Sequence, residues 1–166
     1  MTHVHNLPQG GQAQQAWAKA ERTKTQRHAD VLHRLESDNK LWIATASLRG
    51  DVHLVPFSFV WDGEHVIMAT RQDSPAARNA ASTGNARVAL GDFADVVLID
   101  GPVTLVSRQA MNSAVADRLA GVSGIDARHA PGFIYLQLLP SRIQAWSSNA
   151  AELASPTVMR DGRWLG

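Results

Sequence analysis

The sequence predicts a mainly β domain in which about six antiparallel strands, with a few helices inserted, close into a barrel or a sandwich. Short β-prone runs follow one another with only turns between them, as at Leu41–Ala46 and Val52–Trp61. This spacing is too short for repeated βαβ units, because a parallel crossover needs a dozen or more residues. The chain has 166 residues, of which 45% are hydrophobic, so a single domain of this size can bury a core.

The N-terminal part of the chain is expected to be a tail followed by a helix. Met1–Gly11 is polar and contains glycine and proline, whereas Gln12–Ser37 is helix-like. The helix carries an apolar stripe at helical spacing, made of Val31, Leu32 and Leu35. We therefore divide the chain into a tail and helix over residues 1–34 and a barrel domain over residues 35–166.

The first three strands are marked by their turns. Arg49–Asp51 reads as a turn, and Asp62–Gly63 is a strong two-residue hairpin signal. Strands are expected at Leu41–Ala46, Val52–Trp61, Glu64–Ala69, Arg87–Phe93, Val96–Val106 and Gly132–Trp146, with a last strand or hairpin at Val158–Trp164. Further helices are expected at Ser74 to about Ala81 and at Gln109–Leu119.

Three prolines interrupt these strands. Proline cannot donate to a ladder, so Pro56 marks an edge strand, a bulge or a place where the sheet opens. Gly101–Pro102 predicts a bulge or bend within its strand, and Pro140 interrupts the run that ends at Trp146. Pro56 is therefore the best sequence indication of a point where the sheet separates to admit a ligand.

The segment ATRQDSPAARN, Ala69–Asn79, predicts an anion site. Serine is a preferred N-cap and proline is favoured at the first helical position, so Ser74 begins a short helix. The free N–H groups of such a helix attract an anion, and Arg71 and Arg78 can clamp a phosphate. The alternative is an ordinary capped helix with solvated arginines.

Composition excludes several function classes. The formal net charge is +1 and no basic stripe is present, so nucleic acid is not an expected partner. No apolar run approaches 18 residues, and the N-terminus lacks the apolar core of a secretory signal, so we expect a cytoplasmic protein without a membrane span. The absence of cysteine removes disulfides, thiolate metal sites and cysteine nucleophiles.

The histidines and tryptophans give no clear catalytic pattern. His28 and His33 are five residues apart, which is not the spacing of a helical metal site, so no metal is expected, although haem ligation stays open. No nucleophile elbow or glycine-rich nucleotide motif is present. Phe59, Trp42 and Trp61 are expected in the core, and the late Trp146 and Trp164 at a subunit interface or against a ring.

The order of the elements carries a resemblance. The chain reads LWIATAS, HLVPFSFVWDG, HVIMATRQDS, ARNAASTGNARVAL and then DVVLIDGPV, and it ends with RIQAW and MRDGRW. From about Leu35 to Trp164 it resembles the FMN-binding split β-barrel superfamily of pyridoxamine 5′-phosphate oxidase, and more closely its flavin and deazaflavin oxidoreductase branch. The resemblance implies a six-stranded antiparallel split β-barrel, mainly β (α+β), that forms a homodimer with FMN or coenzyme F-420 in clefts between the subunits.

The resemblance also implies the residues that contact the cofactor. It places Val55, Pro56, Phe57 and Ser58 along the ring, Ala69, Thr70 and Arg71 at its polar edge and ribityl chain, Ser74, Arg78 and Asn79 at the phosphate, and Trp146 at the ring from the other subunit. The family often has a lysine near the start of the short helix, where this chain has Pro75–Ala77, so Arg71 and Arg78 remain as the cations.

The function expected from this resemblance is hydride transfer between the cofactor and a small organic substrate, with no catalytic residue assigned. Pyridoxamine-phosphate oxidase activity itself is not expected, because only Arg160 and Arg163 remain as basic residues near the C-terminus. The alternatives are a non-catalytic carrier of flavin, deazaflavin or haem, and a scaffold that has lost its pocket.

Overall fold

The structure, a computed structural model, describes residues 20–166. The expected tail and the first residues of the expected helix, up to residue 19, lie outside this range. The helices are α2 (Lys24–Ser37), α3 (Pro75–Thr83), α4 (Ser113–Ser123) and α5 (Ala150–Ala154). The strands are β1 (Lys40–Ala46), β2 (Val52–Ser58), β3 (Val60–Trp61), β4 (Val66–Arg71), β5 (Asn85–Asp92), β6 (Asp95–Val106), β7 (Phe133–Leu138), β8 (Arg142–Ser147), β9 (Thr157–Arg160) and β10 (Arg163–Trp164).

These strands form one curled antiparallel sheet of ten strands, so the predicted mainly β antiparallel class is confirmed and the predicted number of six strands is wrong. The run Val52–Trp61 divides at Phe59, whose side chain is fully buried and whose N–H donates to the carbonyl of Asn39. This break lets β3 leave β1 and pair with β4. The last segment, for which a strand or a hairpin was predicted, forms the hairpin of β9 and β10.

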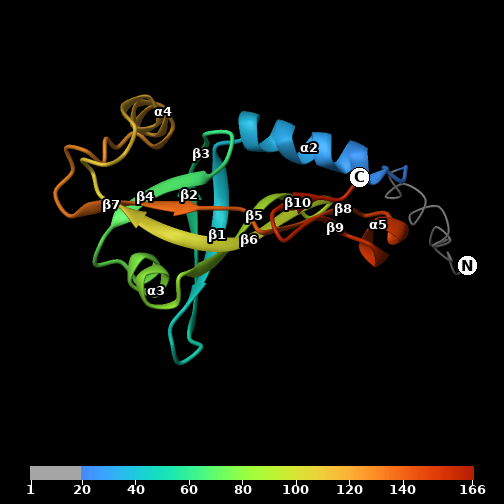
Figure 1. The fold of residues 1–166 in the computed structure, drawn as a ribbon, viewed down its shortest axis with the longest axis horizontal. Helices are drawn as coiled ribbons and strands as arrows, with labels where there is room; N and C mark the ends of the chain where they lie inside the picture. Colours follow the sequence, from blue (N-terminus) through green and yellow to red (C-terminus); the bar gives the residue numbers. More distant parts are fainter. Residues whose placement is uncertain (1–19) are drawn as a thin grey trace, which may run out of the picture.

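Strand β6 runs through the curled sheet (Figure 1), and Gly101 lies at the point where it changes partners. Before this residue β6 pairs with β8, and after it β6 pairs with β7. A Cβ atom at Gly101 would overlap the carbonyl oxygen of Leu139, which belongs to the turn between β7 and β8. The predicted bulge or bend at Gly101–Pro102 thus coincides with the change of partner, and the close approach of two backbones explains why the residue is glycine.

Replacing Gly101 with alanine is expected to destabilise the fold by about 1–3 kcal/mol, the usual cost of overpacking, because the neighbouring atom is backbone and cannot rotate away. Gly121→Ala is the matched control, since a Cβ there meets nothing within 4 Å and alanine favours the helix. Urea unfolding of both variants checks the prediction. Equal stability of the two variants would show that the bend tolerates a side chain.

The sheet is open between β2 and β4. In the described chain β2 pairs only with β1, and β4 pairs with β3 and β7, so no ladder joins β2 to β4. Pro56 lies on this edge strand opposite Trp42, where the missing N–H removes no ladder bond. Of the alternatives that the sequence left for Pro56, the structure shows the edge strand beside an opening.

Helix α2 packs against the curled sheet, and ion pairs of Arg22 hold it there. Its residues Val31 and Leu35 are fully buried in the main core. The predicted boundary between the N-terminal part and the barrel domain, at residues 34 and 35, falls within this helix. Just before the helix, the Arg22 guanidinium donates to Glu152 on α5, to Asp95 on β6 and to Asp30 on α2. The charge cluster thus joins three elements that are distant in the sequence.

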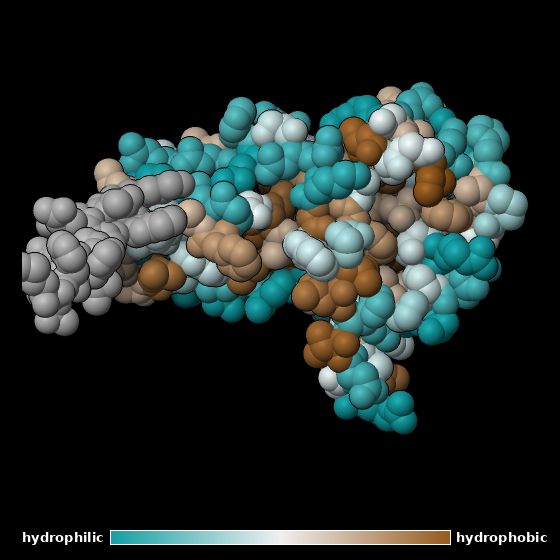
Figure 2. Space-filling view, turned by 180° about the vertical axis from the view of Figure 1, so that it is seen from behind, coloured by the Kyte–Doolittle hydropathy of each residue, from teal (hydrophilic) through white to brown (hydrophobic). Residues whose placement is uncertain are grey.

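The sheet face opposite the core is partly apolar and exposed. Directly paired residues share a face, and the pairs Trp42–Pro56 and Ala44–Leu54 lie on the outer one. Trp42 is 51% exposed and Leu54 is 58% exposed, so the predicted core position of Trp42 is wrong, whereas Phe59 and the partly buried Trp61 do pack against the core. Figure 2 shows hydrophobic side chains on and beside the β1–β2 hairpin, which projects from the molecule.

Among residues 20–166 no helix is long and apolar enough to cross a membrane.

Candidate functional site

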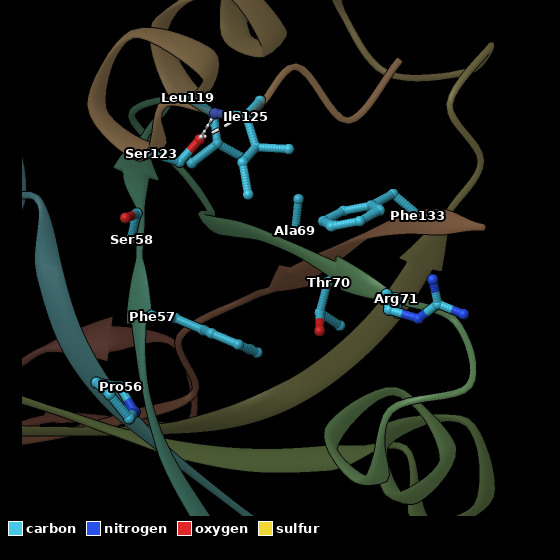
Figure 3. A pocket seen from close by; sticks show the side chains of 10 residues that line it. All are labelled: Pro56, Phe57, Ser58, Ala69, Thr70, Arg71, Leu119, Ser123, Ile125 and Phe133. Carbon is cyan, nitrogen blue, oxygen red and sulfur yellow. Dashed lines mark hydrogen bonds between the residues drawn. The ribbon is translucent and has the colours of Figure 1, made fainter. Parts of the chain in front are cut away.

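A cavity of about 300 Å³ lies in the opening between β2 and β4. The two strands and the segment from α4 to β7 line it (Figure 3). Its lining residues are Pro56, Phe57, Ser58, Ala69, Thr70, Arg71, Leu119, Ser123, Ile125 and Phe133. Six of these were predicted from the sequence to contact a cofactor, so the structure brings the β2 and β4 motifs together around one space.

The walls of the cavity are mainly apolar. Figure 3 shows Phe57 projecting from β2 and Phe133 projecting from β7 into the space between the strands. Aromatic faces of this kind suit a flat ring, because offset and edge contacts with another ring are favourable. The lining hydroxyls of Ser58 and Thr70 already have partners, since Lys40 Nζ lies 2.6 Å from Ser58 Oγ and Thr70 Oγ1 lies 3.3 Å from Ser74 Oγ.

The polar rim of the cavity lies where β4 leads into α3. Ser74 caps the helix as predicted, and its Oγ accepts a hydrogen bond of 3.1 Å from the N–H of Ala77. The Arg71 guanidinium is exposed and donates two hydrogen bonds of 2.9 Å to the carboxylate of Asp73. These bonds raise the pKa of Arg71 and lower the pKa of Asp73, so both groups stay charged at neutral pH.

Asp73 also holds the second predicted cation. The Arg78 guanidinium donates to the backbone carbonyl of Asp73, and the Arg78 side chain is otherwise exposed. Both arginines that the sequence assigned to a phosphate are therefore turned towards one acidic residue. A phosphate can replace the Asp73 carboxylate at Arg71, because exposed arginine side chains reorient readily and accept bidentate anions.

Five predicted residues are not among those that line the cavity: Ser74 and Arg78, which lie beyond its rim at Arg71, and Val55, Asn79 and Trp146. Val55 packs against the main core, and the Asn79 amide donates a hydrogen bond of 3.2 Å to the buried hydroxyl of Thr45. Trp146 is on β8 opposite Val96, on the same outer face as Trp42. Within one chain Trp146 does not line the cavity, and its contact with a ring bound in a second subunit stays a prediction.

The sequence reading missed the wall opposite β2 and β4. Leu119, Ser123, Ile125 and Phe133 belong to α4, the loop after it and the start of β7. No polar motif distinguishes these residues, and they stand 50 to 64 residues after Ala69 in the chain, so only tertiary packing identifies them. Asp73 was also missed, although a carboxylate two residues after Arg71 is a visible signal for an ion pair.

The residues present fit a phosphate-bearing planar cofactor. The cavity offers apolar and aromatic walls for a ring, and the rim offers two guanidinium groups and the first turn of α3 for a phosphate. The Asp73 carboxylate is the one part of the rim that competes with this role. Residues 20–166 contain no group of three or more histidine, aspartate or glutamate side chains arranged to hold a metal ion.

Several solved structures have the same fold. General stress protein 26 of Bacillus anthracis has 13% identity and a TM-score of 0.55, over 70% of this chain and 91% of that one. HutZ, the haem storage protein of Vibrio cholerae, has 14% identity and a TM-score of 0.60, over 82% and 99%. An F420 reductase has 16% identity and a TM-score of 0.55, over 67% and 93%. Identities this low establish the fold alone.

Sequence comparison identifies the family. No curated protein matches the chain. The family model of pyridoxamine 5′-phosphate oxidase matches residues 26–147, which include every residue that lines the cavity. The chain therefore belongs to the pyridoxamine 5′-phosphate oxidase family.

Proposed function

We propose that the protein is an oxidoreductase that binds FMN or coenzyme F-420 in the opening between β2 and β4 and transfers a hydride to or from a small organic substrate. The observation that carries this proposal is a cavity with aromatic walls from β2 and β7 that has the Arg71 guanidinium of β4 at its rim. The family membership and the fold shared with an F420 reductase support it. A bound flavin or deazaflavin supplies the hydride chemistry, which explains why the cavity needs no acid, base or nucleophile of its own.

The residues of the chain then have positioning roles. Phe57 and Phe133 hold the ring between them, and Ala69 leaves room for it because its side chain is a single methyl group. Thr70 and Ser74 face the polar edge, and Arg71 and Arg78 bind the phosphate. Such placement is sufficient for catalysis of hydride transfer, since proximity and orientation dominate a reaction between two held partners.

A second copy of the chain completes the site in this proposal. The outer sheet face carries the exposed Trp42 and Leu54 and extends across β5 and β6 to Trp146 on β8. Contiguous apolar surface of this kind marks an interface. Pro56 lies both on this face and on the cavity lining, so a partner seated here reaches the ring position, and its Trp146 is the residue we assign to that contact.

Non-catalytic binding is the second candidate, because the fold is shared with the haem storage protein HutZ. The lining of the cavity argues for the flavin proposal, since none of its described residues is a histidine that could ligate haem iron. Turnover separates the candidates. A carrier would hold its ligand without exchanging electrons with a substrate faster than the free ligand does.

The Arg71–Asp73 pair gives a test of the phosphate position. Arg71→Ala is expected to weaken FMN binding about tenfold, because a charge-assisted contact is lost. Asp73→Asn is expected to strengthen it several-fold, because Arg71 is released and a negative charge next to the phosphate is removed. Fluorescence titration measures both dissociation constants.

Riboflavin is the matched ligand for this test, since it has the same ring and lacks the phosphate. Neither variant is expected to change riboflavin binding. Equal effects of Arg71→Ala on the binding of FMN and riboflavin would place the phosphate elsewhere. Weaker binding of FMN by Asp73→Asn would show that the Asp73 carboxylate supports the site instead of competing with the phosphate.

A further inference from the structure

The wall formed by α4 and the loop that follows it has no charged side chain in the cavity. Its lining residues are Leu119, Ser123 and Ile125. The Ser123 hydroxyl is already engaged with the backbone of Ile125, donating to its carbonyl at 3.1 Å and accepting from its N–H at 3.2 Å. A ligand against this wall therefore meets carbon atoms and a hydroxyl that is already satisfied.

Charged residues do occur on the same segment, but they are engaged with one another and with the backbone. Arg128 bridges Asp117 on α4 and Asp126 in the loop, and Arg118 donates to the carbonyl of Trp61. The hydrogen bonds from Arg128 hold the pKa of Asp126 below its ordinary value, so this pair stays ionised. Arg108 donates to the carbonyls of residues 128 and 130. These contacts fix the position of the loop.

Ile125 is the exposed apolar side chain of the α4 wall. It is 49% exposed and yet lines the cavity, directly after the left-handed cap at Gly124 and before the Asp126 ion pair. Its backbone is therefore well fixed while its apolar side chain is available to a ligand. On the other side of the cavity, the only ionisable side chain among the described lining residues is Arg71, whose charge is balanced by Asp73.

We infer that the α4 wall selects the substrate, and that the substrate is an uncharged conjugated ring compound that contacts Leu119 and Ile125. This inference rests on the proposed function, because it assigns the β2–β4 side of the cavity to the cofactor. A charged substrate would lose its hydration against this wall without gaining a counter-charge. A flat apolar substrate keeps its contacts with Ile125 and with the ring that lies between Phe57 and Phe133.

The test is equilibrium binding of two probes of the same ring size, neutral naphthol and anionic naphthalenesulfonate, followed by fluorescence or calorimetry. The protein is titrated both with saturating FMN or F-420 and without cofactor. Wild-type protein is expected to prefer naphthol by about tenfold. Ile125→Lys is expected to reverse this preference by weakening naphthol and strengthening naphthalenesulfonate several-fold, and Ile125→Leu to preserve it.

Leu153→Lys is the control, because Leu153 is as exposed as Ile125 but lies on α5. It adds the same charge and is expected to leave both affinities unchanged. Equal binding of the two probes to the wild-type protein, or the same shift in both lysine variants, would overturn the inference. Failure of FMN and F-420 to bind would overturn the proposed function. Comparison of the wild type with Ile125→Lys without cofactor would still test the wall, because Arg71 is the same in both proteins.

Discussion

Replacing Glu152 with glutamine is expected to destabilise the protein by about 3 kcal/mol, the lower end of the range for breaking a buried ion pair. The Glu152 side chain is fully buried and accepts four hydrogen bonds, three from Arg22 and one of 2.7 Å from the N–H of Ser147. Glutamine keeps one acceptor and presents an amide N–H₂ to donors, so Arg22 is left partly unpaired. A fall of about 6–12 °C in Tm corresponds to this loss in a chain of this size.

The effect also depends on pH. Burial raises the pKa of Glu152, but the hydrogen bonds from Arg22 and Ser147 outweigh burial and lower the pKa from 4.5 to about 2. A group whose pKa is depressed in the folded state stabilises it fully above its unfolded value and loses this contribution as the pH falls through the folded value. The difference in stability between wild type and Glu152→Gln is therefore expected to be constant above pH 4.5 and to disappear near pH 2.

Glu36→Gln on the exposed face of α2 is the control for this prediction. It removes the same charge from the surface and is expected to change Tm little, because exposed charges contribute less than about 1 kcal/mol. Thermal unfolding of the two variants between pH 2 and pH 7 measures how much the buried charge of Glu152 contributes to stability. A Tm for Glu152→Gln equal to that of Glu36→Gln would show that the charge cluster does not fasten α2 and α5 to the sheet.

Replacing Leu54 with aspartate is expected to convert the proposed dimer into monomers at micromolar concentration. Leu54 is 58% exposed on the outer face of β2, beside Trp42, so the substitution leaves the core of one chain intact. In the dimer the carboxylate would be buried without a partner, which costs several kcal/mol at each of the two symmetric positions. Cofactor binding is expected to weaken at least tenfold in the monomer, because the wall from the second copy is lost.

Leu153→Asp is the matched control for assembly, since Leu153 is 51% exposed but lies on α5 and not on this face. Light scattering gives the mass of each variant, and a flavin titration gives the affinity. A wild-type protein that is monomeric while it binds cofactor, or a Leu54→Asp variant that stays dimeric, would contradict the assignment of this face to a second copy.

The part of the site that could be predicted from the sequence is the part that is local in the chain. The motifs around Pro56 and Ala69–Arg71 stand on β2 and β4, which follow one another closely in the chain through the β3–β4 hairpin, so both edges of the opening come from one short segment. The cap at Ser74 follows equally from local chemistry, because serine before proline begins a helix whatever the rest of the fold does. The predicted antiparallel order and the bend at Gly101–Pro102 rest on the same short-range signals.

The remainder depends on contacts between distant segments. Nothing in the run VHLVPFSFVW shows that Phe59 turns into the core and divides the strand, because the alternate aromatic residues Phe57, Phe59 and Trp61 read as one continuous strand. The exposure of Trp42 follows from its register with Pro56, not from its residue type. The α4 wall with Leu119 and Ile125 is brought to the cavity by packing over β4 and β7, which no local pattern specifies.

Equilibrium titration of the cofactor-free protein with FMN, F-420 and haemin, each followed by fluorescence and absorbance, is the decisive measurement for the proposed function. Saturable binding of FMN or F-420, weakened by Arg71→Ala, with haemin bound weakly or not at all, is the expected result. Binding of neither FMN nor F-420, with Arg71→Ala indistinguishable from wild type, would contradict it and would leave Arg71 and Arg78 as surface charges beside a capped helix.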